Sequence, residues 1–452
     1  MNLLFKIIPV PFQNFLISAY NTYQYKVRHG GKYSEYRKYY QEASVLNESE
    51  IKLEQEKRLD KFLKSATHNS KWYSKLFDYK ALSDFPILNK TDLINNLNDI
   101  ATIKESDAIV SLTGGTTGAS MKVLYTKENT QERHALLDHF RARYGYNLGK
   151  KCAWFSGKSI VTDNNLKKGV CYRDDYINKI RFFSTFHITE ANFDTYWAAF
   201  WEFSPEYLVG FPSSVYELCL MAQSRGLTFK NKVVAFFPTA ETLLPVHREV
   251  IASVLGCKIA DQYASSEGAP FILECEYGGL HIHPLTGVFE VVDENMKPAN
   301  EGEILVTSFT TEGTPLIRYR VGDRIKLAPS GVQCKCGSFF PLVESIEGRS
   351  TDFILSPSHG KVNLGNISNA TKDIKGIVMF QVIQNHTDKV VVDVVSNKEF
   401  TSYEQEKFKK ALLVRFGSMA VDISLVDNIK KEKSGKFRIV KNNLELKMNS
   451  IN

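Results

Sequence analysis

Apolar residues recur at helical spacing in the segment SEIKLEQEKRLDKFLKSA, residues 49–66. Its three leucines and Phe62 fall broadly on one face, and charged side chains occupy the positions between them. Apolar positions three and four residues apart are typical of an amphipathic helix on a protein surface. We therefore predict a surface helix here, which begins within a helical extension over residues 1–60.

Farther along the chain, between about residues 100 and 265, short β-rich runs alternate with helical stretches. The strand-like runs are CAWFS (152–156), KVVAFFP (232–238) and CKIADQY (257–263), and LPVHREVIASVLG has helical character. Such alternation is typical of helices packed in layers against a sheet. This part of the chain is therefore predicted to be α/β.

The pattern changes twice more toward the C-terminus. Residues 287–320 are dense in strand-like runs punctuated by glycine, which predicts a β subdomain built from hairpins. After residues 347–352, the chain has strand-like runs and one helix-like segment, which predict a small α+β unit of about 100 residues. The runs are MFQVIQ (379–384), KVVVDVV (389–395) and VDISLV (421–426), and the helix-like segment is YEQEKFKKALLVRF (403–416). The predicted fold class is thus α/β, with a large N-terminal domain of several subdomains (1–348), a hinge (349–352) and a small mobile C-terminal α+β domain (353–452).

The composition is that of a folded globular protein. Hydrophobic residues make up 43% of the 452 positions and charged residues 24%, so the chain can bury the cores of two or three domains. The net charge of +7 is modest and spread out, which suits an anionic ligand and predicts no nucleic-acid partner. Seven cysteines without a secretory signal favour a reducing compartment, so we expect the protein in the cytoplasm.

The N-terminal stretch MNLLFKIIPVPFQNFLISAYNTYQYK is apolar and aromatic but interrupted. Lys6, two prolines and Gln13-Asn14 leave it far below the ~18 apolar residues of a membrane span, so no transmembrane span is expected. A peripheral amphipathic contact with a membrane stays open, and we favour packing onto the body of the protein. The oligomeric state also stays open, and a dimer is compatible with the sequence.

A loop poor in side chains lies in SLTGGTTGASMKV, residues 111–123, between two apolar runs. Glycine lets another molecule approach the backbone, and threonine hydroxyls with amide N–H groups can all point at one anion. The loop lacks the lysine of a Walker A motif in every register. Alone, it indicates either phosphate binding or an ordinary connection between strands.

Five further motifs follow this loop in order. They are TAET (239–242), DQYASSEG (261–268), TPLIRYRVGDRI (314–325), EGRSTDF (347–353) and KSGKFRIV (433–440). Together the six motifs resemble the adenylate-forming acyl-ligase superfamily, and within it the phenylacetate-coenzyme A ligase group with its CapK-like relatives in capsular-polysaccharide gene clusters. The resemblance covers roughly residues 60–440.

The glycine loop resembles the family's phosphate loop, in which Gly-Thr-Thr-Gly is followed by lysine and proline. Here Ala119 and Ser120 stand at those two positions, and Lys122 is a candidate substitute for the lysine. Hydroxyls and amides of such a loop donate to phosphate oxygens that a larger side chain would block. The resemblance assigns the ATP phosphates to Thr113, Gly114, Gly115, Thr116, Thr117 and Gly118.

The motif DQYASSEG resembles the family's Tyr-Gly-x-Ser/Thr-Glu, with Ala264 in place of the glycine. The resemblance places Tyr263 beside the adenine and Ser266 near the α-phosphate. It also implies that Glu267 binds the magnesium ion, because Mg²⁺ prefers one or two carboxylate ligands together with phosphate oxygens. Gln262 is counted with the ATP-binding residues.

Three more motifs complete the nucleotide site that the resemblance implies. Ala240 and Glu241 correspond to a segment that borders the adenine largely through its backbone. Asp323, in IRYRVGD, would accept hydrogen bonds from both ribose hydroxyls, because a carboxylate can take two O–H donors at once. Arg349 would reach the nucleotide, and either Thr351 or Asp352 would be the pivot between the domains.

The motif KSGKFR resembles the family's C-terminal lysine motif. Lys436 would enter the site in one orientation of the C-terminal domain and bridge the substrate carboxylate and the α-phosphate, where it offsets the negative charge that develops during reaction. The same lysine in a lysine-rich tail would otherwise be read as solvated.

Cysteine and histidine form two close pairs in CEYGGLH and CKCG. Three thiolates and one imidazole suit a structural tetrahedral zinc site, and the phenylacetate-ligase group carries similarly placed residues. An equally supported alternative is that these cysteines are buried free thiols that bind no metal. His283 is a second candidate for the histidine ligand, beside His281. The candidate ligands are Cys275, His281, Cys334 and Cys336, whereas Cys152, Cys171, Cys219 and Cys257 are predicted to be core residues.

The resemblance implies an AMP-forming acyl ligase that uses ATP and Mg²⁺ to activate a carboxylic acid, in a context of surface-polysaccharide assembly. The acceptor stays open between coenzyme A and an amine or sugar, and an aryl-acid coenzyme A ligase is the alternative. The acid is expected near GFPSSVYELC and Phe236-Phe237. A degenerate nucleotide-binding protein without turnover is a third interpretation, since Ala119 and Ala264 replace two usual motif residues.

Overall fold

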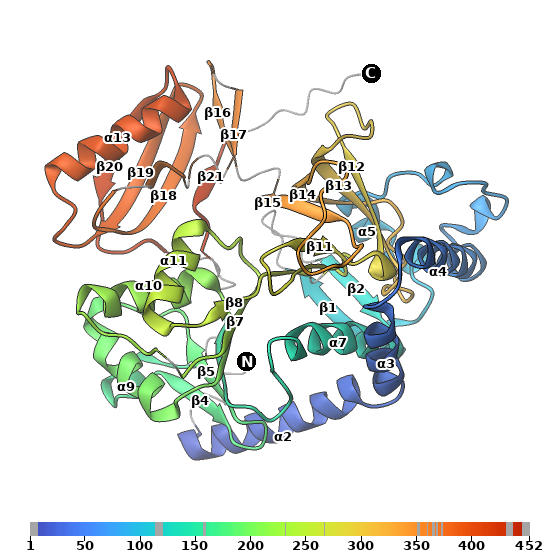
Figure 1. Ribbon diagram of the computed structural model, residues 1–452. Coiled ribbons are helices and arrows are strands. Elements are labelled where there is room, and N and C mark those ends of the chain that lie inside the picture. The colour runs from blue at the N-terminus through green and yellow to red at the C-terminus, as the bar shows by residue number, and fades with distance from the viewer. Residues whose placement is uncertain are drawn as a thin grey trace.

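The structure is a computed structural model of the chain. It describes residues 8–113, 121–156, 160–230, 232–265, 267–349, 353–358, 360–363, 367, 369–371, 374–430 and 437–444. Figure 1 shows a small C-terminal unit beside a larger body, as the predicted fold class requires.

The predicted surface helix is α4, which extends from Glu48 to Asn69. The Asn47 side chain accepts from the Glu50 N–H and the Glu50 carboxylate accepts from the Asn47 N–H, so a capping box fixes the start of the helix. α4 buries Phe62 and Leu63, whereas Leu53 is exposed, so the buried face is narrower than the pattern predicts. The other helices of this region are α2 (Val10–His29), α3 (Tyr33–Ala43), α5 (Lys90–Asn95) and α6 (Leu97–Ile100).

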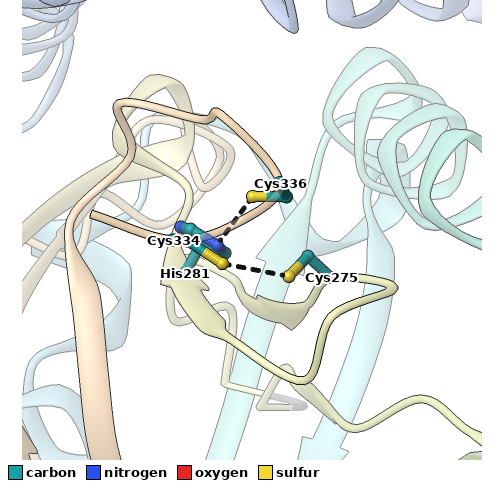
Figure 2. Close-up of side chains that lie close together, drawn as sticks. All are labelled: Cys275, His281, Cys334 and Cys336. Carbon is teal, nitrogen blue, oxygen red and sulfur yellow. Dashed lines mark hydrogen bonds between the residues drawn. The ribbon is translucent and has the colours of Figure 1, made fainter.

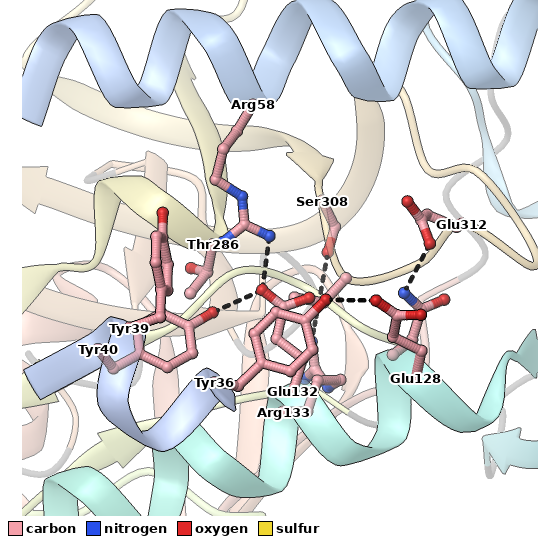
Figure 3. A network of polar contacts seen from close by, with 12 residues as sticks. Tyr36, Tyr39, Tyr40, Arg58, Glu128, Glu132, Arg133, Thr286, Ser308 and Glu312 are labelled. Atoms are coloured by element: carbon pink, nitrogen blue, oxygen red, sulfur yellow. Dashed lines mark hydrogen bonds and ion pairs between the residues drawn. The ribbon is translucent and has the colours of Figure 1, made fainter. Parts of the chain in front are cut away.

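A buried polar network joins α3 and α4 to α7 (Lys127–Ala142), as Figure 3 shows. The Glu132 carboxylate accepts from the Tyr40 hydroxyl at 2.8 Å and forms an ion pair with Arg58. Tyr36 donates to Glu128 at 2.7 Å. Because removing one partner would leave a buried charge unpaired, the network fixes how the helical extension lies on α7.

The α/β region predicted between residues 100 and 265 contains a six-stranded sheet. Its strand order is β4-β5-β3-β6-β7-β8, and all neighbours are parallel except β4 and β5. The predicted strand at 232–238 is the shorter β7, and the one at 257–263 is divided into β8 and β9. The strands are β3 (Cys152–Ser156), β4 (Tyr172–Asp175), β5 (Ile180–Ser184), β6 (Tyr207–Gly210), β7 (Ala235–Pro238) and β8 (Lys258–Ile259); the helices are α8 (Asp163–Lys167), α9 (Phe193–Phe203), α10 (Pro212–Ser224) and α11 (Pro245–Leu255).

The β subdomain is a seven-stranded antiparallel sheet of order β12-β13-β14-β15-β11-β10-β9. One hydrophobic cluster joins it to α4 and β2, and includes Phe62, Val123 and Ile304. The strands of this sheet and of the β1–β2 hairpin are β1 (Ile109–Thr113), β2 (Met121–Tyr125), β9 (Gln262–Tyr263), β10 (Ile272–Glu274), β11 (Leu280–Ile282), β12 (Gly287–Val292), β13 (Glu301–Ser308), β14 (Tyr319–Leu327) and β15 (Leu342–Arg349).

The C-terminal unit has its own hydrophobic cluster, built from a four-stranded sheet and α13. β21 pairs in parallel with β18, which places the segment that follows the predicted lysine motif within this sheet. The domain limits and the hinge stay predictions, because residues 350–352 are outside the described part of the chain. The elements are β16 (Phe353–Ser356), β17 (Gly360–Asn363), β18 (Ile377–His386), β19 (Lys389–Ser396), α13 (Ser402–Phe416), β20 (Ala420–Leu425) and β21 (Val440–Asn442).

Candidate functional site

The glycine loop connects β1 and β2, which form an antiparallel hairpin in which Thr113 pairs with Met121. Gly114, Gly115, Thr116, Thr117 and Gly118 lie outside the described residues, so their assignment to phosphate stays a prediction. The Lys122 ammonium contacts both carboxylate oxygens of Glu105, at 2.8 and 3.1 Å. Lys122 is therefore already paired at the surface, which weighs against its replacing the missing loop lysine.

Two predicted nucleotide-binding residues meet although they are 60 positions apart in the chain. The Tyr263 hydroxyl in β9 donates to the Asp323 carboxylate in β14 at 2.6 Å. Asp323 lies opposite Arg349 in the β14–β15 ladder, which brings the backbone of a third predicted residue to the same place. A carboxylate beside a tyrosine ring offers a nucleoside an acceptor for its hydroxyls and an apolar face for its base.

Glu267 lies close to Met121, the residue that begins β2 after the glycine loop. Its carboxylate accepts from the buried Tyr319 hydroxyl at 3.2 Å, and the same hydroxyl lies 3.6 Å from the sulfur of Met121. Glu267 is thus held at the end of the hairpin that carries the loop, where phosphates would be expected. Ser266 lies outside the described part of this turn.

The turn that carries Glu267 is fixed by residues that the motif did not predict. Gly268 has a φ of +96°, and a Cβ there would lie 2.4 Å from a Thr311 methyl carbon. Arg133 in α7 donates to the carbonyl oxygens of Gly268 at 3.1 Å and of Ser265 at 3.3 Å. Arg133 is therefore a positioning residue for this turn, and nothing in its ordinary helical context marks it.

The motif predicts a role mainly for the backbone at Glu241, but the Glu241 side chain also forms two hydrogen bonds. Its Oε2 accepts from the Ser213 N–H at the start of α10 at 3.2 Å, and its Oε1 accepts from the Phe437 N–H at 2.9 Å. The preceding Ala240 has a φ of +69°, a left-handed conformation that is rare outside glycine. One carboxylate thus joins the larger body to the residue that directly follows Lys436.

The position of Lys436 itself lies outside the described residues, so its catalytic role stays a prediction. Its neighbour Phe437 lines an apolar cleft between α10, α11 and the C-terminal sheet, together with Tyr216, His247 and Met379. Burial lowers the pKa of His247 to about 3, so the imidazole is neutral and adds no charge to this cleft. The cleft includes part of the segment GFPSSVYELC, where the acid was expected.

Gln262 links two sheets. Its amide nitrogen donates to the Pro238 carbonyl at 3.2 Å, and its amide oxygen accepts from Arg141 at 3.3 Å. Below it, burial and the neighbouring Glu274 raise the pKa of Asp261 to about 6. The Gln262 side chain therefore already hydrogen-bonds to the Pro238 carbonyl and to Arg141, and its role in ATP binding stays a prediction.

Figure 2 shows the four candidate metal ligands close together, where the β10–β11 hairpin meets the loop between β14 and β15. Their ligand atoms all lie within 4.8 Å of one another, with 3.5 Å between the sulfurs of Cys275 and Cys334. The Cys336 sulfur lies 3.3 Å from Nε2 of His281. In a tetrahedral zinc site with Zn–S bonds of about 2.3 Å, neighbouring sulfurs are about 3.8 Å apart, so the donor set fits zinc.

The hydrogen bonds around the cluster orient its ligands. His281 contacts the Phe340 carbonyl oxygen through Nδ1 at 3.0 Å, which leaves Nε2 facing the sulfurs. The competing His283 is buried against the rings of Tyr40 and Phe340 and does not belong to the cluster. The other cysteines are buried as predicted, namely Cys152, Cys171, Cys219 and Cys257.

Among the described residues, no helix is long and apolar enough to cross a membrane.

Comparison with known proteins places the chain in a family. The family model of the CapK C-terminal domain matches residues 354–443. Protein CapK of Staphylococcus aureus is 31% identical over 98% of this chain and 100% of its own length. Phenylacetate-coenzyme A ligase of Thermus thermophilus is 26% identical over 70% of this chain and 74% of its own length.

The fold is also found among solved structures. The 2-hydroxyisobutyryl-CoA ligase in its postadenylation state, in complex with R3-HIB-AMP, superposes with a TM-score of 0.70 at 17% identity, over 89% of this chain and 91% of that one. The same ligase in its thioesterification state superposes with a TM-score of 0.56. The full-length match to CapK and this common fold together show that the chain belongs to the CapK-like group of the adenylate-forming acyl-ligase superfamily.

Proposed function

We propose that the protein activates a carboxylic acid with ATP and passes the acyl group to an acceptor. In the first half-reaction an acid oxygen attacks the α-phosphorus, and the bond from this phosphorus to the pyrophosphate oxygen breaks. In the second, a nucleophile attacks the acyl carbon and AMP leaves. The observation that carries the proposal is the meeting of separate motifs at one place, where Tyr263 contacts Asp323 and Glu267 lies at the end of the loop hairpin.

The chain's own residues would bind and orient the nucleotide. The Asp323 carboxylate accepts a hydrogen bond from the Tyr263 hydroxyl and would also accept from the ribose hydroxyls. The ring of Tyr263 would cover one face of the base. Glu267 is the residue that would hold magnesium, which neutralises phosphate charge when bound. Arg133 keeps Glu267 in place by holding the carbonyl oxygens of its turn.

The C-terminal domain contributes the remaining charge. The Glu241 carboxylate holds the N–H of Phe437, and Lys436 is joined to that nitrogen by one peptide unit. The cationic side chain would offset the charge that develops on the α-phosphate and the acid. The higher TM-score with the postadenylation state than with the thioesterification state agrees with a domain arrangement that serves the first half-reaction.

For the finer function, we favour acyl transfer during capsule or surface-polysaccharide assembly, which rests on the similarity to CapK. The acceptor would then be an amine or a sugar. Coenzyme A is the alternative acceptor, supported by the phenylacetate-coenzyme A ligase relative. The apolar lining of the cleft that includes Tyr216 and Phe437 favours an acid with an aryl or alkyl body.

The test is acid-dependent exchange of labelled pyrophosphate into ATP, screened over aryl, fatty, amino and uronic acids. We expect one acid class to support exchange, and Glu267→Gln to reduce it by roughly two to three orders of magnitude. Glu344→Gln is the matched control, because Glu344 is an exposed carboxylate paired with Lys326. Nucleotide binding without exchange for any acid would instead identify a degenerate binding protein.

We also propose that Cys275, His281, Cys334 and Cys336 hold one structural zinc ion. The support is the 4.8 Å grouping of one imidazole and three thiol ligand atoms. All seven cysteines lack a disulfide, which supports a reducing compartment such as the cytoplasm.

A further inference from the structure

Helix α2 presents a stripe of apolar residues to solvent. Its outward stripe contains Phe12, Phe15, Tyr20 and Tyr23, which are 59%, 62%, 62% and 64% exposed. Leu16 is 39% exposed and lies in the same stripe, because these positions are three and four residues apart. Exposed apolar side chains are common singly, but a continuous stripe of five on one helix marks an interaction surface.

The opposite face of α2 packs onto the body and its most buried residues are polar, although Ile17 and Tyr25 also pack against a hydrophobic cluster. Its buried residues are Gln13, Asn14 and Ser18, which pack onto β4 and the turn that follows it. The Asn14 amide donates to the Tyr176 hydroxyl at 3.0 Å, and its oxygen accepts from the Asp174 N–H at 3.2 Å. The Ser18 hydroxyl accepts from the Tyr176 N–H at 3.0 Å.

These hydrogen bonds fix the rotation of the helix about its axis. If α2 rolled to bury its aromatic stripe, it would leave the Asp174 N–H and the buried side chains of Gln13 and Asn14 without these partners, and each unpaired buried group is costly. The sequence therefore holds the apolar stripe outward rather than merely failing to bury it.

The turn after β4 extends this surface. Tyr176 and Ile177 are 64% and 61% exposed, and Tyr176 touches α2 through the two hydrogen bonds to Asn14 and Ser18. We call the surface formed by Phe12, Phe15, Leu16, Tyr20, Tyr23, Tyr176 and Ile177 the α2 face. Figure 1 shows α2 along the edge of the molecule away from the C-terminal sheet, so the α2 face does not overlap the candidate nucleotide site.

The exposed charged residues on α2 and on the turn after β4 are positive. Lys26 continues the outward stripe, and Lys179 is exposed in the turn beside Ile177. Residues 8–34 contain no carboxylate. Asp174 and Asp175 lie beneath the helix, where Arg181 and Asn21 contact them, and both are buried. Aromatic residues with basic neighbours suit the interface of an anionic bilayer, where tyrosine keeps its ring in the acyl boundary and its hydroxyl in water.

We propose that the α2 face binds the surface of an anionic lipid membrane. A second copy of the chain is a poorer partner, because a two-fold contact would bring the same surface of each copy together and place Lys26 and Lys179 of both copies at one interface. The contact is peripheral, since the aromatic side chains reach only the boundary of the acyl region while β4 keeps the polar face of the helix.

The experiment is sedimentation of the full-length protein with vesicles of phosphatidylcholine alone or mixed with phosphatidylglycerol. We expect binding to the mixed vesicles, weakened by added salt because the basic side chains interact with the lipid charge. The double variant Phe15→Ser/Tyr23→Ser should bind at least about tenfold more weakly. The variant Tyr403→Ser/Val414→Ser is the matched control, since both side chains are exposed on α13 and lie outside the α2 face.

Both double variants change exposed positions, so their thermal unfolding midpoints should match that of the wild type and confirm that they fold. Lys26→Glu should weaken binding to the mixed vesicles only. Three outcomes would overturn the proposal: no binding by the wild type, equal binding to both vesicle types, or equal loss in the α13 control. A concentration-dependent dimer that only Phe15→Ser/Tyr23→Ser abolishes, without vesicle binding, would assign the α2 face to a second copy instead.

Discussion

The contact between Glu241 and Phe437 gives the sharpest test of how the two domains cooperate. Glu241→Gln keeps the size of the side chain but removes its charge and one of its two acceptor oxygens. In the structure these two oxygens accept from Ser213 and Phe437, so the variant can keep only one bond of the same kind. We expect acid-dependent pyrophosphate exchange to slow because the segment that carries Lys436 is no longer held.

The size of the effect follows from the type of bond. A hydrogen bond to a charged group contributes about 1.5–3 kcal/mol, or roughly 10- to 150-fold in an equilibrium constant. Glu241 is half-buried, so we take the lower end and expect the exchange rate to fall about tenfold. Because the bond joins protein to protein, kcat should fall more than the KM for ATP rises.

The control and the refuting result are both specific. Glu249→Gln removes an exposed carboxylate from α11, and it should leave exchange unchanged. Transfer from a supplied acyl-adenylate should also be spared in Glu241→Gln, since we propose that the docked arrangement serves only the first half-reaction. An unchanged kcat with a raised KM for ATP would show that the Glu241 side chain serves nucleotide binding and would refute the domain-docking role.

Three further changes test other parts of the molecule. Lys436→Ala should reduce adenylate formation by about 10²- to 10³-fold yet spare transfer from a supplied acyl-adenylate, which is read out by assaying the two half-reactions separately. Metal analysis of tag-free protein should find about one zinc per chain, and Cys336→Ser should lose it and lower the thermal unfolding midpoint, because a closed site contributes directly to folding. Asp261→Asn should raise the free energy of unfolding at neutral pH by on the order of 1–3 kcal/mol. The pKa of Asp261 is about 6 in the folded protein and exceeds its ordinary value of 3.8, so the wild type loses stability as pH rises from about 4 to about 6. Chemical denaturation across this range should therefore give a flatter profile in the variant.

The sequence predicted the elements better than the contacts between them. Local alternation identified α11, β18, β19 and α13 within a few residues, because burial on one face leaves a periodic signal. The division of the strand predicted at 257–263 into β8 and β9 could not be read in this way. The two pieces join different sheets, and this depends on pairing with strands far away in the chain.

The candidate site shows the same limit. The resemblance predicted that Tyr263 and Asp323 bind one nucleotide, which stays a prediction, but their 2.6 Å contact depends on the order of strands in the seven-stranded sheet and could not be predicted. Arg133 escaped notice because an arginine in a charged helix looks solvated, whereas its guanidinium holds the turn of Glu267. The grouping of the three cysteines with a histidine was predictable because these residues come in two close pairs, and the structure brings His281 rather than His283 into the group; its zinc ion stays a prediction.

In helix α2, the most buried residues are polar and a stripe of apolar residues is exposed, which is the opposite of what a hydrophobic pattern usually predicts. An apolar aromatic stripe is normally taken as the buried one, and packing onto the body was the favoured interpretation. The helix does pack onto the body, but its fully buried residues are Gln13, Asn14 and Ser18, and of its apolar residues Ile17 and Tyr25 pack against the core beside them. The signal was present in the kind of polar residue: α4 faces water with Glu and Lys, whereas the polar stripe of α2 consists of uncharged amides and a hydroxyl. Such groups can be buried when each finds a partner, at a far lower cost than charges. An uncharged polar stripe opposite an aromatic one therefore indicates a helix that is anchored by hydrogen bonds and leaves its apolar side for another surface.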